Sequence, residues 1–558
     1  MFRRFHHRAG HYLLLIALVA GLYLPNLGAP SLWDIDEGNN AEAAREMLER
    51  GNWGVPTFNF QTRVDKPALL YWLQITAYRV FGINEFAARL PSALAALAAV
   101  LLAYELGRLL FTPAAALLGG VILASTAMFA ASAHFANPDA LLSACTILTL
   151  LIFWSGFRRE GRGWFIPAGV SAGLGVLAKG PVGLVLPGAV ILLFLLWSRR
   201  LRLLLDRRLA LGVLAFAVTA LPWYVWVGAE TKGEFLRGFF WVHNVSRYCA
   251  PMEGHGGPPY YYLLTLILGF VPWSVFLGLT LWYAVQESRT QDRGLRIDPD
   301  DSARPDPRSS VRFLWCWIAV YLVFFSLSST KLPNYILPVY APMALLTARF
   351  LDRWQRGFVS PPAWVVHASL AFLGLVGIAT SLGLLMAAGV IDVAALRSRS
   401  LPGLAVHAWP GLLPVLGAAA AWGCAARRQR RGAVVSIALT AVLFVGTLAG
   451  GASVAVDADK APRPLAQAFE SQQTEREVRV GCYQYFRPSL VFYCRREVSQ
   501  LADEQQVLEF LRYPIPVYLF TPASVWQRLE ARVPGPHRVL GRHRDLYLGC
   551  DVVVVGNH

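Results

Sequence analysis

The sequence has little charge for its length. Only 15% of its 558 residues are charged, against about 25% in ordinary soluble domains, while 55% are hydrophobic and the mean hydropathy is +0.44. These figures exclude a disordered chain and a string of soluble domains. The net charge of 51 − 35 = +16 would fit a nucleic-acid binder, but long apolar runs favour a membrane protein, whose cytoplasmic loops accumulate Arg and Lys.

Cysteine is also scarce. Seven cysteines are too few and too scattered for a disulfide framework, and no Cys-x-x-Cys or zinc-ligand spacing occurs. Cys482 and Cys494 lie in the polar C-terminal part, and they would pair only if that part lies in an oxidising compartment. The sequence leaves this pairing open.

Apolar segments long enough to cross a bilayer recur along the first 450 residues. A helix needs about 20 predominantly apolar residues to span the hydrocarbon core. Such segments lie near residues 11–28, 90–110, 114–133, 139–157, 163–178, 181–197, 209–228, 260–285, 311–329, 333–350, 362–388, 404–425 and 433–451. A further apolar segment, 68–82, is expected as a lead-in helix. The pattern predicts a polytopic α-helical membrane protein with about thirteen transmembrane helices.

Arginine-rich connections fall on every second loop, which predicts that these loops and the N-terminus are cytoplasmic. One of them, between residues 286 and 312, is rich in Asp, Arg, Pro and Ser and is expected to be a flexible loop. The opposite, non-cytoplasmic face then holds the two long loops 30–67 and 230–259 and the short turns near 134–139, 179–183 and 328–335. With an odd number of spans, the tail also lies there.

The tail has the sequence pattern of a small soluble domain. Its alternating segments predict strands at 479–482, 517–520 and 551–555 and helices at 504–512 and 523–531. We therefore divide the chain into a transmembrane domain, 1–454, and a C-terminal α/β domain, 455–558. No glycine-rich nucleotide loop precedes the tail helices, so we assign the tail no chemistry.

The number and placement of the lysines give the most information about a functional site. Only five of the 51 basic residues are lysine, and all five map to the non-cytoplasmic side: Lys66, Lys179, Lys232, Lys331 and Lys460. A lysine ammonium is a compact charge that suits a single phosphate oxygen, whereas arginine is a planar fork. Chance placement in an arginine-biased sequence is the alternative for any one of them.

Carboxylates gather on the same side. Asp36 and Glu37 follow the first span, and Asp65 and Lys66 stand directly before another apolar segment. Asp139 lies at the start of a span, where an aspartate would also cap a helix. Solvated surface carboxylates are the alternative for the first group, and capping is the alternative for Asp139.

Two further segments add cations. The 230–259 loop contains His243-Asn244-x-x-Arg247, in which Arg247 suits bidentate phosphate binding, while a lone histidine is a weak metal signal. Lys331-Leu332-Pro333-x-Tyr335 contributes a cation and a phenol. Together with the carboxylates, these residues predict an outward-facing site at the membrane boundary that holds a lipid phosphate.

The sequence resembles the polytopic glycosyltransferases of GT-C fold that use polyprenyl-phosphate sugars, and within them the bacterial 4-amino-4-deoxy-L-arabinose lipid A transferases, relatives of the protein O-mannosyltransferases. The resembling residues run in family order from about 30 to 340: Asp36-Glu37-Gly38; Ala41-Glu42-x-x-Arg45-Glu46-Met47; Gly51-Asn52-Trp53-x-Val55-Pro56; Asp65-Lys66-Pro67-x-Leu69-x-Tyr71-Trp72-Leu73; Phe81-Gly82-x-Asn84-Glu85-Phe86; Arg89-Leu90-Pro91-Ser92; Asn137-Pro138-Asp139; Lys179-Gly180-Pro181-Val182-Gly183; Pro222-Trp223-Tyr224; His243-Asn244-x-x-Arg247; and Lys331-Leu332-Pro333-x-Tyr335-x-x-Pro338.

The resemblance implies an inner-membrane enzyme of a Gram-negative cell that transfers aminoarabinose from undecaprenyl phosphate to a lipid A phosphate, a modification associated with resistance to cationic peptides such as polymyxin. It implies that Asp36 is the catalytic acid residue of the first loop and that Lys66, Arg247 and Tyr335 hold the carrier phosphate. It places a possible structural zinc at Asp65 and His243, although Asp65 stands where the family often has Glu.

The expected site thus has four kinds of member. Asp36 and Asp139 are the catalytic carboxylates, and no cofactor is required for the chemistry. The donor phosphate is bound by Lys66, Arg247, Lys331 and Tyr335. Glu37, Lys179 and Asn244 contact substrate, and Asp65 and His243 are the metal candidates. The expected partners are the lipid-linked sugar, lipid A or another lipid acceptor, and membrane lipids, with no nucleic acid.

Three alternatives remain at this stage. A related enzyme would transfer another sugar, such as a hexose, mannose or a uronic acid, to a lipid or protein acceptor. A flippase would share the spans and the cations, but it needs polar groups deep in the bilayer, and the apolar spans carry few. A scaffold protein would need no such cluster of charges.

Overall fold

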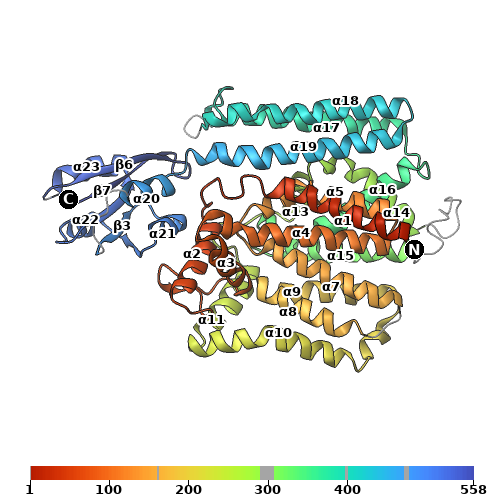
Figure 1. The fold of residues 1–558 in the computed structure, drawn as a ribbon, viewed down its shortest axis with the longest axis horizontal. Coiled ribbons are helices and arrows are strands. Elements are labelled where there is room, and N and C mark those ends of the chain that lie inside the picture. The colour runs from red at the N-terminus through yellow and green to blue at the C-terminus, as the bar shows by residue number, and fades with distance from the viewer. Residues whose placement is uncertain are drawn as a thin grey trace.

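The computed structural model describes residues 2–159, 163–289, 307–395, 400–470, 477–533 and 535–557. Long helices lie side by side in one bundle, and a smaller domain containing the C-terminus projects from one end of it, whereas the N-terminus lies at the other end (Figure 1). Most of the predicted loop between 286 and 312, residues 290–306, lies outside the described residues.

The bundle consists of helices that follow the predicted apolar segments. The α-helices are α1 (Phe2–Tyr23), α2 (Asp36–Glu49), α3 (Leu69–Phe81), α4 (Glu85–Leu110), α5 (Pro113–Ala124), α6 (Ala127–Ala133), α7 (Asp139–Arg159), α8 (Phe165–Lys179), α9 (Val182–Trp197), α10 (Leu209–Glu230), α11 (Glu234–Leu236), α12 (Arg247–Cys249), α13 (Tyr261–Gly269), α14 (Leu277–Arg289), α15 (Pro307–Leu327), α16 (Tyr340–Gln355), α17 (Ala363–Ala387), α18 (Leu412–Ala426) and α19 (Arg430–Asp457).

Shorter elements connect these helices. The 3₁₀ helices are η1 (Leu201–Leu205), η3 (Trp273–Phe276), η4 (Pro333–Val339), η6 (Pro402–His407) and η7 (Trp409–Gly411), and η2 (Arg237–Ser246) is a π-helix. The strands β1 (Thr57–Phe58) and β2 (Gln61–Thr62) form a small antiparallel hairpin in the first loop.

Local sequence signals begin and end several of these helices. Asn84 caps α4 by accepting a hydrogen bond from the Ala87 N–H, and Thr112 caps α5 in the same way, with Pro113 in the first turn. α8 ends at Lys179, and the next residue, Gly180, has a φ of 82°, in the left-handed region that glycine adopts without strain. The chain therefore turns sharply from α8 into α9.

By length and composition, seven helices in the described part of the chain are long and apolar enough to cross a membrane, or nine if two bent pairs each count as one span. Three shorter apolar helices, at Arg8–Tyr23, Phe165–Lys179 and Val182–Trp197, come in addition. The polytopic helical fold is confirmed, and the number of thirteen spans stays a prediction.

Two of the predicted spans are bent. The segment 114–133 is divided into α5 and α6, which meet at 65°, and the segment 260–285 breaks between α13 and η3–α14, which meet at 111°. The second break lies at Pro272, which has no N–H to donate and whose ring disturbs a continuing helix. The apolar segment predicted at 260–285 is thus a bent pair of helices.

The tail domain contains a mixed sheet covered by helices on both faces. Its elements are α20 (Pro462–Glu470), β3 (Arg479–Tyr483), α21 (Pro488–Cys494), β4 (Val498–Leu501), α22 (Glu504–Leu511), β5 (Val517–Pro522), α23 (Ala523–Leu529), η8 (Glu530–Arg532), β6 (Arg538–Asp545) and β7 (Cys550–Gly556). The strand order is β4-β3-β5-β7-β6, with β3 parallel to both β4 and β5, and β7 antiparallel to both neighbours.

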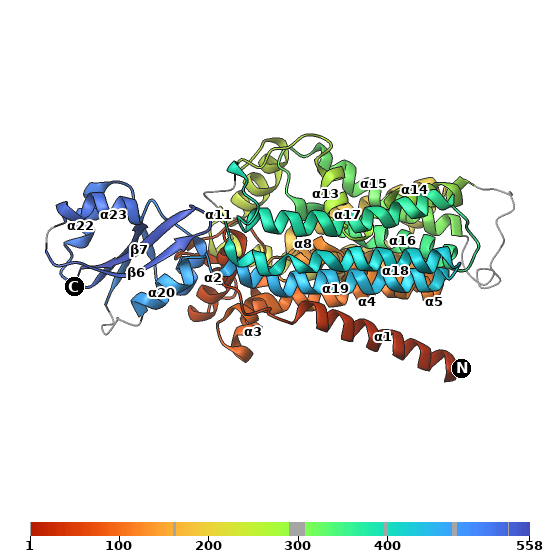
Figure 2. The ribbon, with the colours of Figure 1, turned by 90° about the horizontal axis from the view of Figure 1, so that it is seen from above.

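The expected tail strands and helices lie where the sequence predicted them, and β4, β6, α20 and α21 were missed. Cys482 and Cys494 are both buried beside the sheet as free thiols. Seen from above, the tail lies beyond the end of the bundle that carries α2, α3 and α11 (Figure 2). The loops that hold the predicted site therefore lie between the helices and the tail.

Candidate active site

A cavity of about 490 Å³ lies at the tail-facing end of the bundle. Its wall comes from the first loop, the start of α7, the turn between α8 and α9, the π-helix η2 and the segment that leads into η4. The predicted site residues that line it are Asp36, Asp65, Lys66, Asp139, Lys179, His243, Asn244, Arg247 and Tyr335. The fold thus brings together residues that are up to about 300 positions apart in the sequence.

Asp139 is held firmly at the floor of this cavity. It is the first residue of α7 and is 2% exposed, and it forms an ion pair with Lys179 at the end of α8. Asn334 donates a second hydrogen bond to its carboxylate over 2.7 Å. The Lys179 ammonium also lies 5.1 Å from the centre of the Tyr335 ring. Asp139 is therefore engaged by two donors, which suits positioning better than proton removal.

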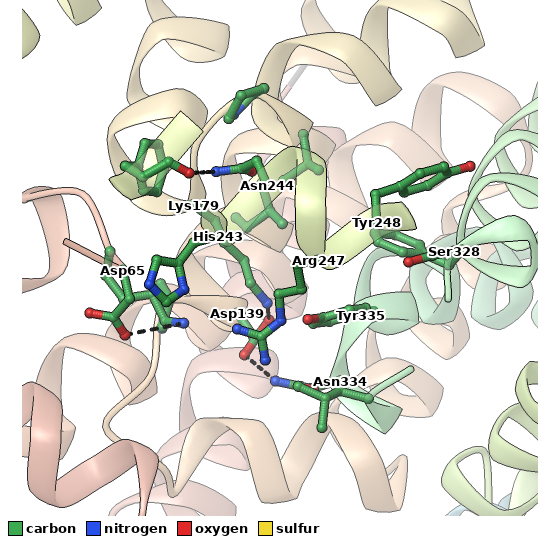
Figure 3. A pocket seen from close by; sticks show the side chains of 18 of the residues that line it. Asp65, Asp139, Lys179, His243, Asn244, Arg247, Tyr248, Ser328, Asn334 and Tyr335 are labelled. Carbon is green, nitrogen blue, oxygen red and sulfur yellow. Dashed lines mark hydrogen bonds and ion pairs between the residues drawn. The ribbon is translucent and has the colours of Figure 1, made fainter. Parts of the chain in front are cut away.

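Arg247 projects into the middle of the cavity. Figure 3 shows its guanidinium between Asp139 and Tyr335. Its Nη2 lies 3.3 Å from Glu253, and its buried Nε has no hydrogen-bond partner among the described residues. A buried donor without a partner is costly, so this guanidinium is poised to bind an acceptor such as a phosphate oxygen.

Asp65 and Lys66 lie at the opposite wall. Arg63 donates to Asp65 from Nε over 2.5 Å and from Nη2 over 2.9 Å, and the Lys66 ammonium lies 3.9 Å from the same carboxylate. Burial alone would raise the pKa of Asp65, but the charges of Arg63 and Lys66 hold it well below its usual range. Asp65 is thus ionised at neutral pH and fixes the neighbouring cations.

The expected metal site is incomplete. His243 lies beside Asp65 (Figure 3), its Nδ1 is buried without a partner among the described residues, and burial lowers its pKa so that the ring is neutral at pH 7. Structural zinc takes four ligands, and no group of three or more His, Cys, Asp or Glu side chains converges in the described part of the chain. Asp65 and His243 would supply two of these four ligands, and the structural zinc stays a prediction.

Asp36 occupies the start of α2 and is exposed at the cavity. Its neighbours in the sequence point elsewhere, because Asp34 contacts the tail domain and Glu37 is buried. Asp36 is therefore the carboxylate of the first loop that is available to a substrate.

Glu37 is not at the cavity, which corrects the expectation of a substrate contact. It is 0% exposed and forms a two-pronged ion pair with Arg89, with distances of 2.8 and 2.9 Å. It also accepts hydrogen bonds from the N–H groups of Trp33 and Ala136. Four donors thus satisfy this buried carboxylate, which anchors the first loop to α4 and to the segment before α7.

We expect Glu37→Gln to destabilise the protein without weakening substrate binding. The change leaves the Arg89 charge buried without a counter-charge, which typically costs about 3–5 kcal/mol. Thermal unfolding in detergent should show a clearly lower midpoint, while the folded fraction keeps its KM for the donor. Glu49→Gln, on the exposed side of the same helix, is the matched control and should change little. An unchanged midpoint with a raised KM would return Glu37 to the substrate site.

Lys331 is also outside the cavity, contrary to its predicted role at the donor phosphate. Its ammonium donates to the carbonyl oxygens of Ser326 over 2.8 Å and Ser328 over 2.6 Å, and it is 5% exposed. Burial lowers its pKa. Lys331 therefore caps the C-terminal end of α15 by donating hydrogen bonds to carbonyl groups that lack partners within the helix.

Asn244 and the apolar wall complete the cavity. The Asn244 side-chain N–H donates to the Phe239 carbonyl over 2.7 Å, and this hydrogen bond lies within the π-helix. Apolar side chains form much of the remaining surface: Leu142, Val182, Val185, Phe239, Phe240, Phe324, Phe325 and Leu332. A second, apolar groove of about 340 Å³ shares Pro181, Val185 and Phe240 with the cavity. Charged and apolar surfaces thus adjoin, as an amphiphilic ligand requires.

Sequence reasoning missed two polar members of this site. Asn334 was an unspecified position in the Lys331–Tyr335 segment, and Arg63 was not considered. The sequence could have indicated both residues, because Asn334 lies three residues after Lys331 and Arg63 lies three residues before Lys66.

Comparison with known proteins identifies the family. Residues 65–226 match the family model described as dolichyl-phosphate-mannose-protein mannosyltransferase. The undecaprenyl phosphate-alpha-4-amino-4-deoxy-L-arabinose arabinosyl transferase of Pseudomonas savastanoi pv. phaseolicola is 34% identical over 381 residues, which cover 67% of this chain and 68% of the relative. The chain belongs to this arabinosyl transferase family.

Other relatives agree with the assignment to the arabinosyl transferase family. The Pseudomonas aeruginosa PAO1 protein of the same name is 36% identical over 346 residues, covering 61% of this chain and 59% of the relative. The crystal structure of ArnT from Cupriavidus metallidurans bound to undecaprenyl phosphate is 25% identical, with a TM-score of 0.80 and 98% coverage of both chains. The chain is thus a glycosyltransferase with the expected GT-C fold.

Proposed function

We propose that this protein transfers 4-amino-4-deoxy-L-arabinose from undecaprenyl phosphate to a phosphate of lipid A, at the periplasmic face of the bacterial inner membrane. The observation that carries the proposal is the convergence of Lys66, Arg247 and Tyr335 beside Asp36 in one cavity of an arabinosyl transferase family member. We place the N-terminus in the cytoplasm and both the cavity and the tail in the periplasm, following the arginine-rich loops.

The cavity surfaces match the two ends of a prenyl phosphate. The cations Lys66 and Arg247 suit the phosphate head, and the apolar wall with its adjoining groove suits the prenyl chain. The relative with the similar fold is bound to undecaprenyl phosphate.

The reaction is a single in-line displacement with inversion. An oxygen of the acceptor phosphate attacks the anomeric carbon, the bond from that carbon to the carrier phosphate breaks, and its electron pair leaves with the carrier phosphate. Lys66 and Arg247 stabilise the growing negative charge on the leaving group, and the Tyr335 hydroxyl donates to it. Preorganised donors of this kind lower the barrier because they need no rearrangement during the reaction.

The role of Asp36 depends on the acceptor. A phosphate acceptor is an anion near pH 7 and needs no general base, so Asp36 orients the acceptor or binds the donor's ammonium group. A hydroxyl acceptor would have to lose a proton, and Asp36 would take it. Asp139 acts less directly, since it fixes Lys179 at the cavity floor.

A second candidate is the transfer of another sugar, a hexose, mannose or a uronic acid, to a lipid or protein acceptor. The match of residues 65–226 to the protein mannosyltransferase family model favours this alternative. It uses the same carrier phosphate and the same cations, and it requires Asp36 to act as a base for a protein hydroxyl.

Mass spectrometry of lipid A distinguishes the two candidates. Cells with and without the gene are compared, and the proposal predicts an added aminopentose on a phosphate only when the gene is present. An added hexose or uronic acid, or unchanged lipid A, would reject the first proposal in favour of the second.

We expect a chelator to leave the transfer rate unchanged. The chain's own cations, Lys66 and Arg247, neutralise the leaving phosphate, and Asp65 is already paired with Arg63 and Lys66. Purified enzyme is treated with excess chelator and assayed with the lipid-linked donor, with the unfolding midpoint measured in parallel. A loss of activity that zinc restores would contradict this expectation.

A further inference from the structure

The tail domain grips the loop that carries Asp36. The Asp34 carboxylate accepts two hydrogen bonds from Ser489 at the start of α21, from its N–H over 2.8 Å and from its hydroxyl over 2.7 Å. In return, the Asp34 N–H donates to the Tyr547 hydroxyl over 3.0 Å. Asp34 is thus held through both its side chain and its backbone by residues about 450 to 510 positions away.

Neighbouring residues of the loop are held in the same way. The Leu32 N–H donates to the Tyr493 hydroxyl over 2.8 Å. The Lys460 ammonium donates to the Ser31 carbonyl over 2.8 Å and lies 3.9 Å from the centre of the Trp33 ring. Each of the four residues from Ser31 to Asp34 therefore contacts the tail.

The other side of the loop is fixed by the bundle. Glu37 is paired with Arg89 of α4, as described above. On the tail side, Gly38 of α2 lies directly against α21, because a Cβ at this position would be 2.4 Å from the Ser489 nitrogen. Asp36 is thus an exposed residue between Asp34 and Glu37, whose carboxylates are both held by several hydrogen bonds.

We infer that the tail domain sets the position of Asp36, and that Ser489 and Tyr547 are positioning residues that act through Asp34. The inference rests on the proposed role of Asp36 in the transfer. It assigns a task in the reaction to a domain that lies outside the cavity. A displacement of a reacting group by about 1 Å can cost a hundredfold in rate, so the contact has a measurable consequence.

The environment of Asp34 agrees with a specific role for its two donors. Burial raises the pKa of Asp34 to about 6, while the hydrogen bonds from Ser489 oppose this effect. At pH 7 the carboxylate is therefore ionised but poorly solvated, and it depends on Ser489.

The test compares Ser489→Ala and Tyr547→Phe, each of which removes one hydroxyl and keeps the rest of the side chain or its Cβ. We expect each to lower kcat/KM for the donor by about tenfold, through the same kinetic constant, kcat or KM, that Asp36→Asn changes. The control is Arg532→Ala, which breaks an exposed ion pair with Glu504 elsewhere in the tail and should leave kcat unchanged. Variants are compared at matched yield and unfolding midpoint, and Tyr547→Phe serves if Ser489→Ala does not fold.

A double-mutant cycle identifies the route of action. In the Asp36→Asn background, Ser489→Ala should cause no further loss, since the group that it positions is already gone. Equal losses in both backgrounds, or unchanged kcat and KM in the single variants, would overturn the inference and leave the proposed function intact. Full activity of Asp36→Asn alone would instead remove Asp36 from the mechanism, and the inference with it.

Discussion

Asp36→Asn is expected to lower transfer by about a hundredfold or more. A charged group that acts only in the transition state typically contributes factors of 10² to 10⁴, and Asp36 is the exposed carboxylate of the first loop at the cavity. The measurement is transfer of the sugar by purified enzyme, with kcat and the donor KM determined separately. Glu234→Gln, which removes an exposed acid of α11, is the control.

The division between kcat and KM shows what Asp36 does. If it binds the donor's ammonium group in the ground state, the donor KM rises and kcat changes less; if it orients the acceptor or removes a proton, kcat falls. If the variant kept both the kcat and the donor KM of the wild-type enzyme, Asp36 would have no role in the reaction.

Removal of either cation that we propose to bind the carrier phosphate is expected to have a comparable effect. Lys66→Gln and Arg247→Gln should each lower kcat/KM for the donor by about a hundredfold, because each removes one preorganised donor to the leaving phosphate. Lys232→Gln is the matched control, since Lys232 is exposed on the same face and does not line the cavity. Unchanged kinetics in either variant would show that this cation does not contact the carrier.

The double variant Lys66→Gln/Arg247→Gln should lose less than the product of the two single losses. In the proposed mechanism both cations act on one phosphate, and the effects of substitutions that act on the same group are not additive. Independent, fully multiplicative losses would indicate that the two side chains bind different groups.

Much of the site could be predicted because its residues have unusual chemistry for their places in the sequence. Lys66 and Lys179 are rare lysines beside apolar segments, and Arg247 follows an aromatic run in an outer loop. Loop orientation then placed them on one side of the membrane, and the structure shows them around one cavity. The charge pattern carried this information without any knowledge of packing.

The same reasoning failed where tertiary contacts decide the role of a residue. Lys331 fitted the lysine pattern, but carbonyl groups at the end of α15 occupy its ammonium. Glu37 adjoins Asp36 in sequence, yet α2 turns it inward to Arg89. A pattern of charged residues in the sequence does not predict which group each charged side chain contacts in the folded protein.

Long-range contacts were the least accessible to sequence reasoning. The pairing of Asp34 with Ser489 joins the first loop to a domain to which no chemistry was assigned. The sharp bend at Pro272 was likewise hidden in a segment that reads as one continuous apolar span. Both features depend on how elements pack, which a single sequence does not record.

Binding of undecaprenyl phosphate and undecaprenol to the purified protein tests the central claim most directly. The two lipids share the prenyl chain and differ in the phosphate. We expect the phosphate to bind at least about tenfold more tightly, and Lys66→Gln or Arg247→Gln to abolish that difference while leaving the affinity for undecaprenol unchanged. Equal affinity of the wild-type protein for both lipids would contradict the account.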